Sequence, residues 1–332
     1  MVPQDTLLVY LVSLIDLIPV PPAPFQLKRG RPKFYPDRLF LKALVVMIVR
    51  HVHTPSGLLA ILAQPTAEMQ TLRQHMTLTD GRFPCRRTWE RRLAAIPNFL
   101  RAQIACLGRF LVIELALWAE AARAAAIDST ALVARGGVWH KKDREAGIVP
   151  HSSIDTEAHW TNSGYHGWIY GWKLHAVIAV AHGVWLPLAA ELTAANAADN
   201  EQAPALIVEL PHDLHFLLGD QHYFDQTLQL LCQQRGCVLV APHTGRNNPY
   251  PHLDDGVEVR KILHKTRSIT IENFNEHFKA SFDVHGSVPT KGLVATRRFV
   301  LAAILVYQLA VYYSFLQHTD LRVGLKALLK CA

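Results

Sequence analysis

Apolar and polar positions recur with helical spacing through the first third of the chain. The run LLVYLVSLIDLI stops at a proline-rich stretch, which predicts a first helix ended by prolines. Residues 36–62 predict two helices broken at the Pro-Ser-Gly of 55–57. In CRRTWERRLAAI, Trp89, Leu93 and Ile96 recur at i, i+4 and i+7, which predicts one buried edge of a further helix. An all-helical N-terminal region is therefore expected.

The pattern changes near residue 123. RAAAIDST reads as a short buried strand that delivers Asp128 at its end, and a long polar loop over 131–169 follows. Two strands are then expected to meet in a hairpin at 182–183. A helix, a strand ending in Asp220, a helix, a strand and the helix that contains ITIENFNEHFK complete the series. This order predicts an α/β fold with a mixed sheet flanked by helices.

The apolar run at 299–316 is about long enough to cross a bilayer. Gln308 stands at its centre, and a single apolar segment near the end of an otherwise polar chain is more typical of a buried helix. We expect a C-terminal packing helix and no membrane partner.

Positive charge is concentrated in the N-terminal part. Of the formal charge of +7, residues 1–125 carry +8 (16 Lys and Arg against 8 Asp and Glu) and the remainder carries −1 (18 against 19). Clustered cations attract polyanions, of which nucleic acid and membrane lipid are the two candidates. We therefore expect a helical, basic DNA-binding region at 1–122 and a separate domain at 123–332.

Arginines gather around the helix predicted by CRRTWERRLAAI. A solvated charged face is the usual explanation of such a run, but their density favours contact with DNA phosphates. The predicted phosphate-binding residues are Arg82, Arg86, Arg87, Arg91 and Arg92.

Two acids follow apolar strands. Asp128 and Asp220 stand where open α/β sheets place functional groups, and a glutamate of the later helix could converge with them. Hard divalent cations take oxygen ligands, and a pair of them can clamp the attacking and leaving oxygens of a phosphoryl transfer. Spacing alone is a weak argument, because most of the 27 acidic residues of such a chain are solvated or paired.

The segments AIDST, LLGDQHYFD and IENFNEHFK together resemble the DDE transposases of bacterial insertion sequences, which have a ribonuclease-H-like catalytic domain. A large subgroup carries a signature around its glutamate. In this signature Tyr and Arg are separated by two residues, Arg and Glu by three, and Glu and Lys by six. Glu272 and Lys279 have the required spacing, whereas Arg267 stands four residues before Glu272 and His264 takes the place of the tyrosine.

The resemblance implies a function and a site. Asp128, Asp220 and Glu272 would be the catalytic and metal-binding triad for two Mg²⁺ ions, with Mn²⁺ as an alternative, and Arg267 and Lys279 would contact transposon-end DNA. The enzyme would cut the phosphodiester with water and join the freed 3′-hydroxyl to target DNA without a covalent protein intermediate. It would work in the bacterial cytoplasm with the nucleoid, as a homodimer on DNA and without a small-molecule cofactor.

Helix geometry distinguishes the two glutamates of this segment. Glu272 and Lys279 flank the expected apolar stripe, whereas Glu276 points further away and could meet Lys279 at i, i+3. The stripe consists of Ile271, Phe274, Phe278 and Phe282. Glu272 is therefore the expected ligand.

Other polar and aromatic residues are explained by structural roles. Scattered cysteines without a CxxC pair indicate a reducing compartment and argue against structural zinc, as does the lack of a second histidine pair beside His212 and His215. Asp155 and Asp199 are expected as loop and helix-cap residues. The four tryptophans of the middle region are expected to be packed, with base stacking as the alternative; they are Trp139, Trp160, Trp168 and Trp172.

Two other function classes stay open at this stage. A DNA-binding regulator or domesticated transposase would keep the basic module and lose the acids. A hydrolytic nuclease of the same fold would keep the acids but would not need Arg267 and Lys279 for end recognition.

Overall fold

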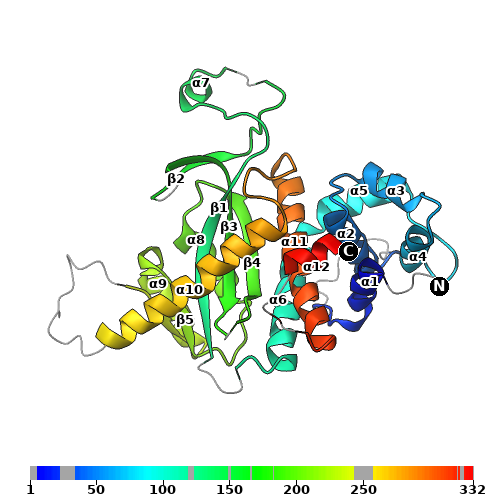
Figure 1. Cartoon of the computed structure of the whole chain (residues 1–332). Coiled ribbons are helices and arrows are strands. Elements are labelled where there is room, and N and C mark those ends of the chain that lie inside the picture. Colours follow the sequence, from blue (N-terminus) through cyan, green and yellow to red (C-terminus); the bar gives the residue numbers. More distant parts are fainter. Residues whose placement is uncertain are drawn as a thin grey trace. The chain divides into compact units, whose positions relative to one another are not determined.

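The computed structural model describes residues 6–22, 34–118, 123–148, 151–164, 167–181, 183–242, 257–319, 321 and 325–331. The chain divides into two compact units, Met1–Leu107 with Arg298–Ala332, and Gly108–Arg297. In Figure 1 the first unit is helical and the second contains the sheet. This is the predicted α/β class with a helical N-terminal region.

The first unit is built from amphipathic helices whose ends are set by local sequence. Thr54 and Thr66 accept hydrogen bonds from the backbone N–H groups of Gly57 and Met69 and so cap two of these helices. Pro55 is the first residue of its helix, so the prediction of a break at 55–57 was wrong by one turn. The helix at 67–75 was not predicted. The helices are α1 (Leu7–Leu17), α2 (Asp37–Val49), α3 (Pro55–Leu62), α4 (Ala67–His75), α5 (Arg86–Ala95), α6 (Pro97–Glu114), α11 (Leu293–Leu316) and α12 (Leu325–Cys331), of which α6 and α11 contribute to both units.

Helix α11 has the length and apolar composition of a membrane span, but 78% of that span is buried inside the protein. Gln308 is fully buried and donates a hydrogen bond from Nε2 to the backbone oxygen of Ile104 at 2.9 Å. A buried amide needs such a partner, because an unsatisfied polar group in an apolar interior costs about 1–3 kcal/mol. The expectation of a packing helix agrees with these contacts.

The second unit contains one mixed sheet. Its main path runs β2-β3-β1-β5-β6, and β4 pairs with the edge of β3 that lies opposite β1. Strands β2, β3, β4 and β1 pair antiparallel, whereas β1, β5 and β6 pair parallel. The strands are β1 (Ala124–Val133), β2 (His159–Ser163), β3 (Gly167–Ala179), β4 (Leu186–Ala194), β5 (Phe216–Leu218) and β6 (Val238–Val240).

Two sequence predictions fail in this unit. β1 does not end at Asp128 but continues for five residues to Val133, because Asp128 pairs with Ala176 and the ladder goes on. The predicted loop over 131–169 contains the end of β1, the short helix α7 (Lys141–Glu145), β2 and the start of β3. In the predicted hairpin, position 182 lies outside the described residues, and Gly183 has a left-handed φ of 76°, which glycine adopts without strain.

Helices cover both faces of the sheet. α10 (Val257–Ser281) contacts β1, β3 and β5, and its buried side is the predicted stripe of Ile271, Phe274, Phe278 and Phe282. α8 (Asp199–Ile207) contacts β3 and β4, and α9 (Gln226–Gln234) contacts β6. The first turn of α11 is fixed in the same unit, since the buried Asp155 accepts a hydrogen bond from the Gly292 N–H at 2.7 Å. Asp155 is thus the loop and cap residue that the sequence predicted.

Candidate active site

Strand register brings Asp128 and Asp220 together. The parallel ladder of β1 and β5 ends at the pair Ala126 and Leu218, and each aspartate stands two residues beyond that pair. Neighbouring strands lie about 4.8 Å apart, so equivalent positions on them are adjacent. The two carboxylates act on each other electrostatically, since Asp220 helps to raise the pKa of Asp128.

Asp128 is a half-buried acid with two donors. Its Oδ1 accepts a hydrogen bond from the Ser129 N–H at 2.7 Å, and its Oδ2 lies 3.0 Å from Nη1 of Arg267. Burial raises the pKa of Asp128 to about 6, and the nearby Asp220 adds to this rise, while the two donors oppose it. Near neutral pH this carboxylate is therefore closer to its titration range than an ordinary aspartate.

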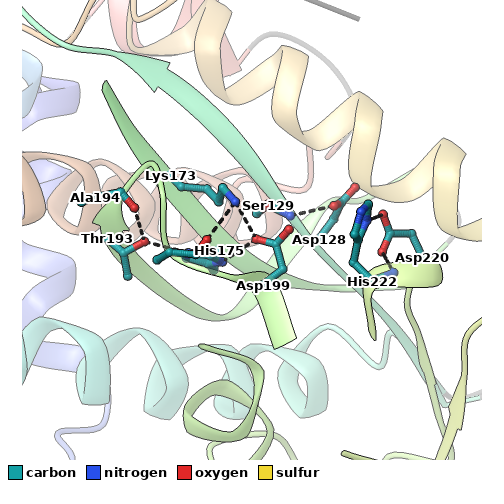
Figure 2. A network of polar contacts seen from close by, with 10 residues as sticks. Asp128, Ser129, Lys173, His175, Thr193, Ala194, Asp199, Asp220 and His222 are labelled. Atoms are coloured by element: carbon teal, nitrogen blue, oxygen red, sulfur yellow. Dashed lines mark hydrogen bonds and ion pairs between the residues drawn. The ribbon is translucent and has the colours of Figure 1, made fainter. Parts of the chain in front are cut away.

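Asp220 forms the start of a short 3₁₀ turn, Gln221–Tyr223. Its Oδ1 accepts from the His222 N–H at 2.8 Å, and its Oδ2 lies 3.0 Å from the His222 ring Nδ1 (Figure 2). This hydrogen bond raises the pKa of His222, and burial of the ring opposes the rise. The Asp-x-His spacing in the sequence is the signal that could have predicted this pair.

Helix α10 brings Arg267 to Asp128. Arg267 is bonded to Asp128 across 139 residues of chain, whereas Glu272 is exposed. Lys279 is half-buried, which lowers its pKa, and Glu276 opposes that shift from one turn away. The expected neighbourhood of Glu276 and Lys279 is present, and the role of Glu272 stays a prediction.

The two aspartates fit a divalent cation in ligand type but do not by themselves complete a site. Carboxylate oxygens are the ligands that Mg²⁺ and Mn²⁺ prefer. Within the described ranges, no group of three or more His, Cys, Asp and Glu side chains is placed to hold a metal ion. Asp128 and Asp220 supply two ligands, and a third would have to come from another acid.

A second polar network lies on the other face of β3. Paired residues of antiparallel strands share a face, so Lys173 and His175 lie with Ser129, opposite the face of Asp128. Asp199, the first residue of α8, lies 3.2 Å from Nζ of Lys173 and 3.4 Å from Nδ1 of His175 (Figure 2). The N-cap of α8 is Ala198 and no side chain caps the helix, so the expected cap role of Asp199 is wrong. Its ion pair was not predicted.

His175 is bonded to the Thr193 hydroxyl. Its ring Nε2 lies 2.9 Å from Thr193 Oγ1, and that hydroxyl also lies 3.1 Å from the backbone oxygen of Ala194. Burial lowers the pKa of His175 to about 4, with the carboxylate of Asp199 opposing the shift. The ring is therefore neutral at pH 7.

Tyr223 is influenced electrostatically by Asp128 and Asp220 and also by Asp199 of the second polar network. It ends the 3₁₀ turn that Asp220 begins, is 1% exposed, and has a hydroxyl without a hydrogen-bond partner among the described residues. Burial and the carboxylates of Asp199, Asp128 and Asp220 raise the pKa of its hydroxyl well above the ordinary value. The phenol therefore keeps its proton.

Comparisons with known proteins assign the family. A family model described as a transposase DDE domain matches residues 120–309, which is more than half of the chain. The chain belongs to the transposase DDE domain family. The resemblance that the sequence showed is thereby confirmed at the level of the family.

Solved transposase structures give weaker likenesses. A piggyBac transposase synaptic complex with hairpin DNA is 8% identical, covers 99% of this chain and 77% of its own, and has a TM-score of 0.43. A Mos1 transposase paired-end complex with the left transposon end is 13% identical, with 86% and 79% covered and a TM-score of 0.23. No curated protein matches the sequence.

The predicted DNA-binding arginines of this transposase differ in their surroundings. Arg87 and Arg91 are exposed on α5. Arg82 pairs with Asp80, and Arg86 pairs with Glu90 at 2.8 Å. The half-buried Arg92 pairs with Asp37 and lies over the ring of Phe40. This last arginine has a structural role that its sequence context did not reveal.

The tryptophans of the DDE domain are divided between packing and exposure. Trp172 is fully buried, and Trp160 donates from its ring N–H to the backbone oxygen of Trp139. Trp168, on β3 beside the turn to β2, is 70% exposed. Packing was the correct expectation for Trp172 and does not hold for Trp168.

Proposed function

We propose that this DDE-domain protein is the transposase of a bacterial insertion sequence, and that it cleaves and joins DNA strands with Asp128, Asp220 and Glu272. The family match supports a transposase. The observation that carries the site is the register of β1 and β5, which sets Asp128 and Asp220 at equivalent positions beyond the last parallel pair.

The proposed reaction is an exchange at phosphorus. A water oxygen forms a new P–O bond while the bond to a 3′ oxygen breaks, which leaves a 3′-hydroxyl and a 5′-phosphate. In the second step that 3′-hydroxyl attacks a target phosphodiester, so one P–O bond again forms as another breaks. Bond number is conserved and no covalent protein intermediate is required, so positioning and charge stabilisation do most of the catalysis.

Asp128 and Asp220 would hold a divalent cation, Mg²⁺ or Mn²⁺, with Glu272 as the proposed third acid and a second ion expected beside the first. Such a cation supplies a Lewis acid and lowers the pKa of a bound water. The protein's own contribution begins with orientation: the Ser129 N–H fixes Oδ1 of Asp128, and the His222 N–H and ring fix both oxygens of Asp220.

Arg267 and Lys279 complete the proposed face toward DNA. Arg267 balances the charge of Asp128 in the present structure, and it lies on the same helix as Glu272 and Lys279. A guanidinium beside two carboxylates is also a suitable donor to a phosphate oxygen that enters between them. We infer that α10 contributes both cations, Arg267 and Lys279, to contacts with the DNA strand that is cut.

The remaining parts of the proposal concern domains and partners. Residues 1–122 would be the DNA-binding region and 123–332 the catalytic domain. The order β4-β3-β1-β5-β6, with an antiparallel part and a parallel part, supports a ribonuclease-H-like catalytic fold. The full protein would act in the bacterial cytoplasm, on double-stranded DNA and as a homodimer at two transposon ends.

The test is metal-dependent cleavage by the full chain. The substrate is a duplex that carries the terminal sequences flanking its gene, incubated with Mg²⁺ or with EDTA. Wild type should nick the duplex only with Mg²⁺, and D128N, D220N and E272Q should not, while E276Q should retain most activity. Nicking by D128N would refute the proposed site, and full activity of E272Q alone would remove Glu272 from it.

A further inference from the structure

Tyr223, three residues after Asp220, is a buried hydrogen-bond donor. The proposed reaction assigns it no role. Its side chain is 1% exposed, and its hydroxyl has no hydrogen-bond partner in the described part of the chain. Buried hydroxyls are nearly always hydrogen-bonded, and one without a partner carries a desolvation cost. Such a group in a native site calls for a functional explanation.

The position of Tyr223 is fixed by the backbone around Asp220. The Tyr223 N–H donates to the backbone oxygen of Asp220 at 3.1 Å, which closes the turn. Gly219 makes room for the ring, since a Cβ at that position would lie 2.7 Å from Cβ of Tyr223. The backbone of Tyr223 is therefore tied to the turn that carries Asp220.

Four charged groups act electrostatically on the Tyr223 hydroxyl: Asp199, Asp128, Asp220 and Arg267, with Asp199 first among them after burial. Asp128 lies on β1, Asp220 at the start of the 3₁₀ turn that follows β5, and Asp199 at the start of α8. The hydroxyl is thus a neutral donor in the field of three carboxylates, and carboxylate oxygens accept hydrogen bonds.

We propose that Tyr223 is a positioning residue of the strand-cleavage site, whose hydroxyl donates a hydrogen bond to the surrounding aspartate carboxylates and holds them in place when DNA is bound. This inference rests on the proposed function, because it assigns Tyr223 to the same reaction.

This role differs in its consequences from that of an ordinary core tyrosine. Tyr223→Phe keeps the ring that packs on Gly219 and removes only the hydroxyl. If the hydroxyl were merely structural, its loss would leave cleavage unchanged. If it positions the carboxylates, kcat falls about 10–100-fold, as for other groups that orient ligands from outside the site, while KM for DNA stays within about twofold.

Tyr170 offers a matched control in the same unit. It is 3% exposed, and its hydroxyl donates to the backbone oxygen of Asp155 at 2.6 Å. Tyr170→Phe removes a satisfied hydrogen bond and should lower the thermal midpoint without a loss of kcat at a temperature where the variant is folded. Tyr223→Phe should show the reverse, a midpoint equal to or above that of wild type together with reduced kcat.

The experiment measures both quantities on the full chain. Thermal midpoints are recorded in EDTA, and kcat and KM are measured with Mg²⁺ and the terminal duplex, for wild type, Y223F, Y170F and D128N. Y223F that cleaves at the wild-type rate, or that loses activity only in proportion to lost folding, would overturn the role of Tyr223. Activity in D128N would instead overturn the proposed function, so the two failures are distinguishable.

Discussion

Nη1 of Arg267 lies 3.0 Å from Oδ2 of Asp128, although 139 residues separate the two in the chain. The guanidinium is only 12% exposed and the carboxylate 22% exposed, so solvent screens the pair weakly. The contact opposes the rise in the pKa of Asp128 that burial causes. It also fixes the rotation of α10 about its axis at this point.

Arg267→Met should raise the pKa of Asp128 above about 6, because a cation that favours the ionised acid is lost. The measurement is an NMR titration of the Asp128 carboxyl carbon in metal-free protein. Lys279→Met is the control, since Lys279 lies on the same helix and is not among the groups that shift this pKa. An unchanged titration in the Arg267 variant would show that the contact is absent in solution.

Asp128→Asn should change how stability depends on pH. A raised pKa means that the native state holds a proton that the unfolded state has lost, so wild type loses stability as pH rises from about 4 to about 6. The unfolding free energy of the variant relative to wild type should therefore grow across this window by up to about 3 kcal/mol and stay constant above it. Urea unfolding in EDTA at several pH values checks this result, and a difference that is flat from pH 4 to 6 would contradict it.

Lys173→Met should destabilise the sheet unit, because it leaves the carboxylate of Asp199 without its ammonium partner. The two side chains are 14% and 18% exposed, and breaking such a pair from one side costs about 2–4 kcal/mol. Pairing the substitution with Asp199→Asn removes both charges and should recover most of the loss. If the double variant is no more stable than Lys173→Met alone, the ion pair is not the source of the effect.

Arginines of α5 should separate into DNA-binding and structural residues. Replacing Arg87 and Arg91 by alanine should weaken binding to any duplex, lower the slope of log K against log salt by about 2, and leave stability unchanged, since both are exposed. Arg92→Ala should instead cost about 1–3 kcal/mol of stability, because it loses Asp37 and the Phe40 ring. Fluorescence anisotropy at several salt concentrations and thermal unfolding test the two halves of this prediction.

The sequence predicted those features that depend on local periodicity. The buried stripe of α10 and the buried edge of α5 follow from apolar spacing along one helix, and both are confirmed. Short apolar runs and the hairpin signal at 182–183 also predicted the strands that form most of the sheet. Burial of a helix face is a local property, so the sequence is sufficient to predict it.

Features that depend on register or on distant partners were missed. β1 was expected to end at Asp128 because that residue follows a short apolar run, yet pairing with β3 extends the strand to Val133. The ion pair of Asp128 with Arg267, and that of Asp199 with Lys173, join segments whose approach is set by the whole sheet. No local pattern encodes which strand residue meets Arg267.

Because β1 continues past Asp128, the number of residues between Ala126 and Asp128 decides on which face of the sheet this carboxylate lies. Successive residues of a strand point to opposite faces, so loss or gain of one residue between Ala126 and Asp128 would turn the carboxylate from the α10 face to the α8 face. Asp220 lies beyond the end of β5, at the start of a 3₁₀ turn, so its direction depends on that turn instead. The connection from β4 to β5 contains a helix and lies outside both of these short segments. Variants of this domain can therefore differ in that connection, but the step from Ala126 to Asp128 must stay even.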